Sequence, residues 1–188
     1  MKPESYCSTT GRNVHSYIVC VSGITAVYLP LSKKMYVQAS LYRSRKGIPM
    51  IAITNGKILT ITQGIIENGI LLVEGGRITA IGPDIEIPAD AEVYDASGKV
   101  VMPGLIDAHT HLSYGHPKLP GEARGAGTTR PELNAIRAAW NAQKVLRAGV
   151  TAISVPGGSW FTDVAVRDAI RIGLVEGPRV FAAGRMIA

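Results

Sequence analysis

The sequence is poor in the residues that define disulfide-rich or membrane-spanning chains. Its 188 residues contain only two cysteines, Cys7 and Cys20, which do not make a disulfide framework. A mostly apolar run from Tyr17 to Leu31 has 15 residues and is short for a membrane span. Charged residues make up 18% and hydrophobic residues 46% of the chain. These values are typical of a globular protein and exclude a disordered one.

Acidic residues are almost absent from the first 49 positions. This segment holds seven lysines and arginines against one acid, Glu4, whereas residues 50–188 hold 13 residues of each sign. The formal net charge of +6 therefore arises in the first quarter of the chain and says nothing about the main body. For this reason we expect no nucleic-acid partner.

Residues 1–49 differ in composition from the rest of the chain, and two interpretations stay open. In the first, they are a non-structural extension before a start at Met50, where the composition changes and a strand pattern begins; the protein is then cytoplasmic. In the second, residues 17–31 are the core of a signal or membrane anchor. If residues 1–39 form such a segment, the protein is exported or anchored. The lysines at 33–34 speak against this second interpretation.

Residues 50–98 predict a small antiparallel β unit of four or five strands. Asn55-Gly56 between apolar stretches predicts a β-hairpin with a type I′ turn, and Gly75-Gly76 predicts a second hairpin. A short strand follows at 91–95. Such a sheet has one apolar face and exposed edges, so we expect it to need partner strands from elsewhere.

From residue 100 onward, strand and helix patterns alternate. Strands are predicted at 100–111, 150–155 and 179–183, and helices at 129–148 and 163–172. We expect Thr129 to begin a capping box for the first helix, Thr162 to cap the second, and Trp140 to pack in the core. This alternation implies parallel strands with right-handed crossovers, in a doubly wound sheet or a (β/α)8 barrel.

Histidine is rare in this chain, yet three of its four histidines, His109, His111 and His116, fall within eight residues. In a strand that ends with His109 and His111, these imidazoles share one face with Asp107. Two imidazoles on one rigid strand suit a divalent ion such as zinc. The alternative is a partly exposed edge strand that carries histidines by chance, and their clustering favours the metal site.

The position of these histidines favours a barrel over a doubly wound sheet. Functional residues of a barrel stand at the carboxyl ends of its strands, as His109 and His111 do here. A doubly wound nucleotide-binding sheet usually has a glycine fingerprint after its first strand, and the glycines of 121–127 lack that spacing. We therefore expect an α/β chain with the first βα units of a (β/α)8 barrel in residues 100–188.

The stretch Pro103-Gly104-Leu105-Ile106-Asp107-Ala108-His109-Thr110-His111 resembles the signature of the amidohydrolase superfamily of metal-dependent hydrolases. Residues 166–170 and 177–185 are similar to the branch that contains imidazolonepropionase and Xaa-Pro dipeptidase. The resemblance covers residues 50–188. It implies that residues 50–99 are the amino-terminal half of a composite β-sandwich, which the far end of such chains completes, and that residues 100–188 begin the barrel.

The resemblance also implies a chemistry. His109 and His111 would bind the first of one or two divalent ions, with zinc as the expected metal, and Asp107 would orient a ligand. The metal would lower the pKa of a water molecule toward neutrality and polarise the scissile carbonyl. The implied reaction is hydrolysis of a carbon–nitrogen bond in a small amide, cyclic amide or dipeptide.

The later ligands of this superfamily have no counterpart in the sequence. They are a lysine or carboxylate, two further histidines and an aspartate that acts as general base, whereas the only lysines after His111 are Lys118 and Lys144. We therefore expect an amino-terminal hydrolase fragment that is inactive by itself. The alternative is a non-catalytic binding or scaffold protein that keeps the first third of the fold, tethered at a membrane through residues 17–31.

Overall fold

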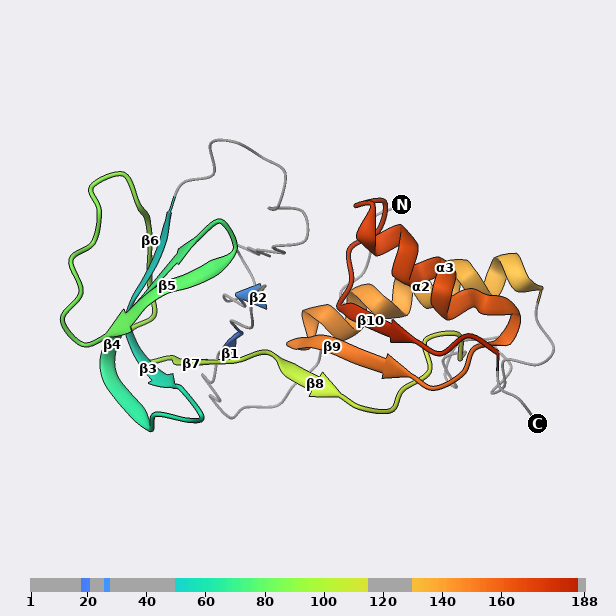
Figure 1. The fold of residues 1–188 in the computed structure, drawn as a ribbon, viewed down its shortest axis with the longest axis horizontal. Helices are drawn as coiled ribbons and strands as arrows, with labels where there is room; N and C mark the ends of the chain where they lie inside the picture. Colours follow the sequence, from blue (N-terminus) through green and yellow to red (C-terminus); the bar gives the residue numbers. More distant parts are fainter. Residues whose placement is uncertain (1–17, 21–25, 28–49, 115–129, 186–188) are drawn as a thin grey trace, which may run out of the picture.

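The computed structural model describes residues 18–20, 26–27, 50–114 and 130–185 (Figure 1). Most of the amino-terminal extension, His116 and Thr129 lie outside these residues. The described chain forms a strand-rich part and an α/β part, and the segment between Met102 and Leu105 connects them (Figure 1). No helix among the described residues is long and apolar enough to cross a membrane.

The first sheet is mixed rather than antiparallel. Its strands are β1 (Ile18–Cys20), β2 (Ala26–Val27), β3 (Ile51–Leu59), β4 (Ile65–Glu74), β5 (Arg77–Gly82), β6 (Glu92–Asp95) and β7 (Val100–Met102). They follow the order β2-β1-β7-β3-β4-β5, with β6 beside the first half of β3. Strands β3, β4 and β5 are antiparallel neighbours, but β6 and β7 run parallel to β3. The prediction of an antiparallel unit is therefore wrong, because the chain returns after a long loop and β6 pairs in parallel with β3.

The hairpin predicted at Asn55-Gly56 is also wrong, because β3 continues through this pair. Asn55 has a φ of 60°, and the register between β3 and β4 shifts on both sides of Gly56. On the opposite strand Asn68 has a φ of 52°, and Gly69 pairs with Gly56. Both Asn-Gly pairs therefore form irregularities inside long strands, where a positive φ is needed as much as in a turn.

The hairpin predicted at Gly75-Gly76 is confirmed. Strands β4 and β5 pair antiparallel with Glu74 opposite Arg77, and both glycines have a positive φ, 56° and 77°, as a type I′ turn requires. One face of the sheet packs into a single apolar cluster of buried side chains, which comprises Ile51, Ile53, Ile58, Leu71, Val73, Ala96 and Val101.

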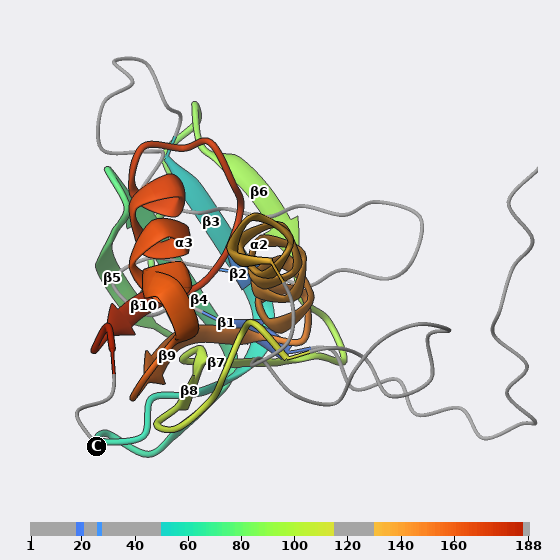
Figure 2. The ribbon, with the colours of Figure 1, turned by 90° about the vertical axis from the view of Figure 1, so that its right-hand side faces the viewer.

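The second sheet has three parallel strands in the order β10-β9-β8. The strands are β8 (Leu105–Asp107), β9 (Val150–Val155) and β10 (Arg179–Ala182), and the helices are α2 (Pro131–Arg147) and α3 (Thr162–Arg171). The two helices lie side by side on one face of the strands (Figures 1 and 2). A short 3-10 turn, Ser159–Phe161, precedes α3. The mixed α/β architecture with parallel strands is thus confirmed.

The single strand expected over 100–111 is two strands in two sheets. Strand β7 pairs with β3, and Pro103-Gly104 then leads the chain to β8, which pairs with β9. A Cβ atom at Gly104 would lie 2.0 Å from the Thr151 hydroxyl, so only glycine lets the backbone pass this close to β9. The break is therefore built into the sequence by proline and glycine.

The helices differ from expectation at their caps and in their buried face. Pro131 opens α2 as expected, but Phe161 rather than Thr162 occupies the N-cap position of α3. Trp140 is 48% exposed with the Lys144 ammonium 3.8 Å from its ring centroid, so its predicted core position is wrong. The buried face of α2 instead includes Ala138 and Ala142, because small side chains let the helix approach the sheet closely.

The packing between helices and strands predicts a large difference between two isoleucines of the second sheet. Ile153 is 0% exposed and Ile106 is 72% exposed. We expect Ile153→Ala to lower the free energy of unfolding by about 2–5 kcal/mol through loss of burial and a cavity, and Ile106→Ala to cost much less. Urea unfolding followed by circular dichroism measures both. Equal losses would contradict the assignment of Ile153 to the core.

The Asn55 bulge depends on a carboxylate at the end of β6. Asp95 Oδ1 accepts hydrogen bonds from the Ser97 hydroxyl (2.6 Å), the Ser97 backbone N–H (3.0 Å) and the Asn55 side-chain amide (3.0 Å). The Ser97 hydroxyl is the main cause that lowers the pKa of Asp95 from 3.8 to about 2, with further contributions from Asn55 and the Ser97 N–H. The ionised form is therefore the one that the fold favours.

This lowered pKa predicts an acid-dependent stability term. Because the pKa of Asp95 is lower in the folded chain, its stabilising effect is present above pH 3.8 and is lost as the pH falls toward 2. Asp95→Asn should flatten the pH dependence of urea unfolding in this window, whereas the exposed Glu74→Gln should not. In an NMR titration, Ser97→Ala should raise the Asp95 midpoint. An unchanged midpoint would show that the hydroxyl does not hold the carboxylate.

Candidate metal centre

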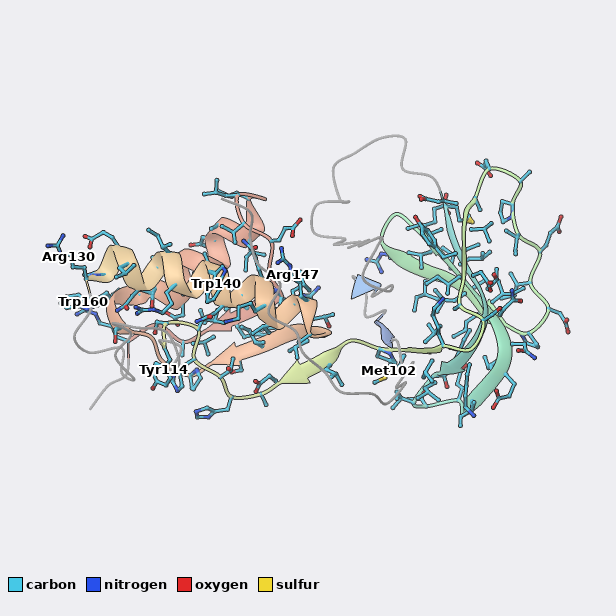
Figure 3. The ribbon with its side chains drawn as sticks, turned by 180° about the vertical axis from the view of Figure 1, so that it is seen from behind. Met102, Tyr114, Arg130, Trp140, Arg147 and Trp160 are labelled. Atoms are coloured by element: carbon cyan, nitrogen blue, oxygen red, sulfur yellow. The ribbon has the colours of Figure 1, made fainter. Side chains whose placement is uncertain are left out.

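The carboxyl ends of β8, β9 and β10 meet at one edge of the second sheet. The segments that follow these strands carry both histidines and a Gly-Gly loop, at the edge where parallel sheets place functional groups. Tyr114, which follows β8, and Trp160, which follows β9, lie at the same end of the α/β part, remote from Met102 (Figure 3). The candidate site is therefore built from loops that consecutive parallel strands position.

His109 and His111 follow β8 rather than lie within it, because the strand ends at Asp107. The carboxylate of Asp107 accepts a hydrogen bond from the His109 backbone N–H at 3.1 Å, as in an Asx turn. One residue later, the Thr110 N–H donates to the Ser154 carbonyl at 3.0 Å and keeps the segment beside β9. The alternation rule of a strand thus gives way to a turn that these two hydrogen bonds fix.

The ring of His111 is oriented by the backbone of the loop after β9. Its Nδ1 lies 3.0 Å from the carbonyl oxygen of Gly157. Because a carbonyl oxygen can only accept, Nδ1 carries the proton, and Nε2 of the neutral ring keeps its lone pair. Metal-bound imidazoles usually have such a partner on the other nitrogen. Sequence reasoning missed this partner, because a backbone carbonyl has no side-chain signature.

The two imidazoles lie close together after β8. Their ring centroids are 5.4 Å apart and the ring planes are inclined at 78°. Two imidazoles on one tetrahedral zinc, with Zn–N bonds of about 2.1 Å, have centroids roughly 5 Å apart. The ring of His111 also stacks on Tyr114, at 4.9 Å between centroids. The geometry of the pair therefore fits a shared divalent ion.

A third ligand does not come from this part of the chain. Among residues 50–114 and 130–185, no three histidine, cysteine, aspartate or glutamate side chains gather closely enough to hold a metal ion. His116, the other histidine of the cluster in the sequence, lies outside the described residues. Within the described residues, the candidate centre therefore has the two imidazoles as its possible nitrogen donors.

A buried carboxylate connects the ends of β9 and β10. Asp163, in the first turn of α3, accepts a hydrogen bond at Oδ2 from the Gly184 N–H at 2.9 Å, and the Gly158 N–H donates to the Gly184 carbonyl at 2.8 Å. A Cβ atom at Gly158 would lie 2.7 Å from Asp163 Oδ1, so the loop packs directly on the carboxylate. Asp163 therefore supports the loop that holds His111. An acid in the first turn of a helix, five residues after a Gly-Gly pair, is the signal that could have predicted it.

Comparison with known proteins finds a matching family and similar chains. The model of the amidohydrolase family matches residues 92–166. The imidazolonepropionase of Geobacillus kaustophilus is 57% identical over 58 residues, which cover 27% of this chain and 14% of that protein. The imidazolonepropionase of Vibrio cholerae is 33% identical over 138 residues, with 58% and 34% covered. The crystal structure of a putative prolidase from Bifidobacterium longum matches with a TM-score of 0.60 and 32% identity, over 74% of this chain and 31% of that one.

The chain belongs to the amidohydrolase superfamily. The resemblance noted in the sequence is thus confirmed at the level of the superfamily, whose members use divalent metals. The chain spans between 14% and 34% of the length of the relatives named above. The loops after β8 and β9, which carry the histidine pair and its carbonyl partner, fall within the matched residues.

The contact of His111 with Gly157 predicts its tautomer. In a ¹⁵N–¹H spectrum of the metal-free protein, at a pH where the ring is neutral, His111 should carry its proton on Nδ1. Asp163→Ala removes the acceptor of the Gly184 N–H and should raise the share of the Nε2–H tautomer. Asp168→Ala, in the same helix and paired with Arg167 at the surface, should leave the tautomer unchanged. A predominant Nε2–H form in the unaltered chain would refute the assignment.

Proposed function

We propose that this chain contributes the first two metal ligands, His109 and His111, of a hydrolase that cleaves carbon–nitrogen bonds. The observation that carries this proposal is the pair of imidazoles 5.4 Å apart at the carboxyl edge of parallel strands. Nitrogen donors of this kind suit zinc better than magnesium or calcium, which prefer oxygen ligands. Zinc is therefore the metal that we assign, as one ion or the first of two.

The proposal extends to the fold. Strands β8, β9 and β10 would be the first three strands of a (β/α)8 barrel, with the first sheet as the amino-terminal half of a composite β-sandwich. The sequential strand order and the position of both helices on one face support a barrel. Ile106 and Phe181, on the face without helices, are exposed, as residues turned toward an incomplete barrel interior would be.

Each residue of the candidate site would have a distinct role. His109 and His111 hold the ion, the Gly157 carbonyl keeps the Nε2 lone pair of His111 available, and the Asp107 carboxylate fixes the backbone at His109. The bound ion would supply Lewis acidity, which makes a water molecule a better nucleophile and polarises the substrate carbonyl. We propose a small amide, cyclic amide or dipeptide as substrate, because the similar proteins include imidazolonepropionases, dihydroorotases and a putative prolidase.

We also propose that the 188-residue chain alone is inactive. Two imidazoles are a weak zinc site, and Asp163, the buried carboxylate near this edge, already binds the Gly184 N–H and lies beneath Gly158. Asp107, the carboxylate next to the histidine pair, accepts the His109 backbone N–H, and we assign no general base among the described residues. The chain would then bind zinc without turning over a substrate.

Zinc titration by calorimetry and an amidase assay test these proposals. The chain should bind zinc through His109 and His111, and alanine at either position should weaken binding by more than the about 10- to 100-fold that loss of a supporting group costs. His15→Ala is the matched control and should bind zinc as the unaltered chain does. Unchanged affinity in both site variants would refute the metal assignment. Turnover of dipeptides or simple amides within a few hundredfold of ordinary enzymes, about 10 per second, would refute the proposed inactivity.

A further inference from the structure

A cationic and aromatic cluster lies at the same end of the α/β part as the candidate metal centre (Figure 3). The guanidinium carbon of Arg185 lies over two rings, 5.5 Å from the centroid of Trp160 and 5.1 Å from that of Phe161. Both distances are within the range of a cation–π interaction, which holds a guanidinium in place without neutralising it. We call these three residues the Arg185 cluster.

Two hydrogen bonds connect the Arg185 cluster with His111. The Gly157 carbonyl accepts from His111 Nδ1, and the next residue, Gly158, donates its N–H to the Gly184 carbonyl. Arg185 directly follows Gly184, and Trp160 is two residues beyond Gly158. The cluster and the histidine pair are thus positioned by the ends of the same strands.

The backbone of the cluster is in an unfavourable conformation. Trp160 and Phe161 have φ values of 60° and 57°, in the left-handed region that bulky residues avoid. Their side chains are 56% and 49% exposed, so burial in the core does not compensate for this conformation. Strained residues of this kind gather at ligand sites, where the surrounding structure holds them in place. Here the Gly158–Gly184 hydrogen bond and the start of α3 do so on either side.

Arg185 lacks an acidic partner among the described residues. The ion pairs in this part of the chain join Lys57 with Glu67, and Arg167 and Arg171 with Asp168. Asp163, the acid nearest in the network, directs Oδ2 to the Gly184 N–H. A guanidinium has five N–H donors in one plane, and a cation–π contact leaves the donors along its edge able to bind an acceptor. An anion with two coplanar oxygens matches this edge.

We propose that the Arg185 cluster is a subsite for the carboxylate of the substrate, in the manner of a bidentate arginine–carboxylate pair. This inference rests on the proposed hydrolase function and narrows its substrate to amides that carry a carboxylate, such as N-acyl amino acids and dipeptides. The guanidinium of Arg185 binds the carboxylate, and Trp160 and Phe161 contact the apolar atoms beside it. The amide bond of the same molecule then lies toward the histidine pair.

Tryptophan fluorescence of the metal-free protein tests the subsite independently of zinc. The full 188-residue chain with Trp140→Phe keeps Trp160 as its single tryptophan. From the fluorescence change, N-acetylglycine should bind at least about tenfold more tightly than the uncharged N-acetylglycinamide, because an arginine–carboxylate pair is among the stronger hydrogen-bonded contacts. Arg185→Gln should abolish this preference, and Arg185→Lys should keep only part of it. Arg147→Gln, at the far end of α2, is the matched control and should change nothing (Figure 3).

Three results would overturn the subsite. They are equal binding of the two compounds, a carboxylate preference that survives in Arg185→Gln, and tighter binding of inorganic phosphate than of N-acetylglycine. Circular dichroism of each variant shows whether it is folded, and Arg185→Lys, which retains the charge, keeps the comparison decisive if the glutamine variant unfolds. The fluorescence titration contains a chelator, so its outcome does not depend on zinc. Loss of zinc binding in the calorimetric titration would therefore count against the metal assignment alone.

Discussion

The hydrogen bond between His111 Nδ1 and the Gly157 carbonyl is the interaction on which the candidate site depends. It joins residues 46 positions apart, so the imidazole pair acquires its geometry only after β8 and β9 have paired. That pairing in turn requires Gly104, because a side chain there would collide with Thr151. The loop that offers the carbonyl is held by Asp163 through Gly184. A candidate metal site that looks local in sequence is therefore a product of three strands and a helix.

The local sequence pattern correctly predicted those elements whose structure is decided by the residues within them. Val150–Val155 is a strand with the expected bounds, and Gly75-Gly76 forms the expected turn, because β-branched residues and consecutive glycines leave few alternatives. Asn55-Gly56 has the same turn chemistry but lies inside a strand. A positive φ serves a bulge as well as a turn, and only the long-range pairing of β3 with β4 and β7 selects the bulge. The prediction that Trp140 packs in the core failed for a related reason, because hydrophobicity alone does not reveal that the alanines of α2 face the sheet.

For the candidate site, the histidine spacing predicted that His109 and His111 lie close together, but it did not predict which groups hold them there. Asp107 contacts the backbone at His109, while the ring of His111 relies on a carbonyl that the sequence does not mark. Asp163 and Arg185 escaped notice because each is an ordinary acid or base until β9 and β10 bring their ends together. What the sequence shows is the donor chemistry, and what it hides is the backbone and the neighbours from other strands that orient the donors.

The Pro103-Gly104 step has a role beyond the motif in which it occurs. Strand β7 ends the first sheet and β8 begins the second, so two residues carry the chain from one hydrophobic core to the other. Proline cannot extend the ladder of β7, and glycine lets the backbone cross Thr151 at close range. If this step moved, β8 would shift against β9, and both histidines would shift with it. The proline and glycine of the signature thus fix the position of the two imidazoles. The spacing of the two histidines, in turn, decides what the imidazoles can bind.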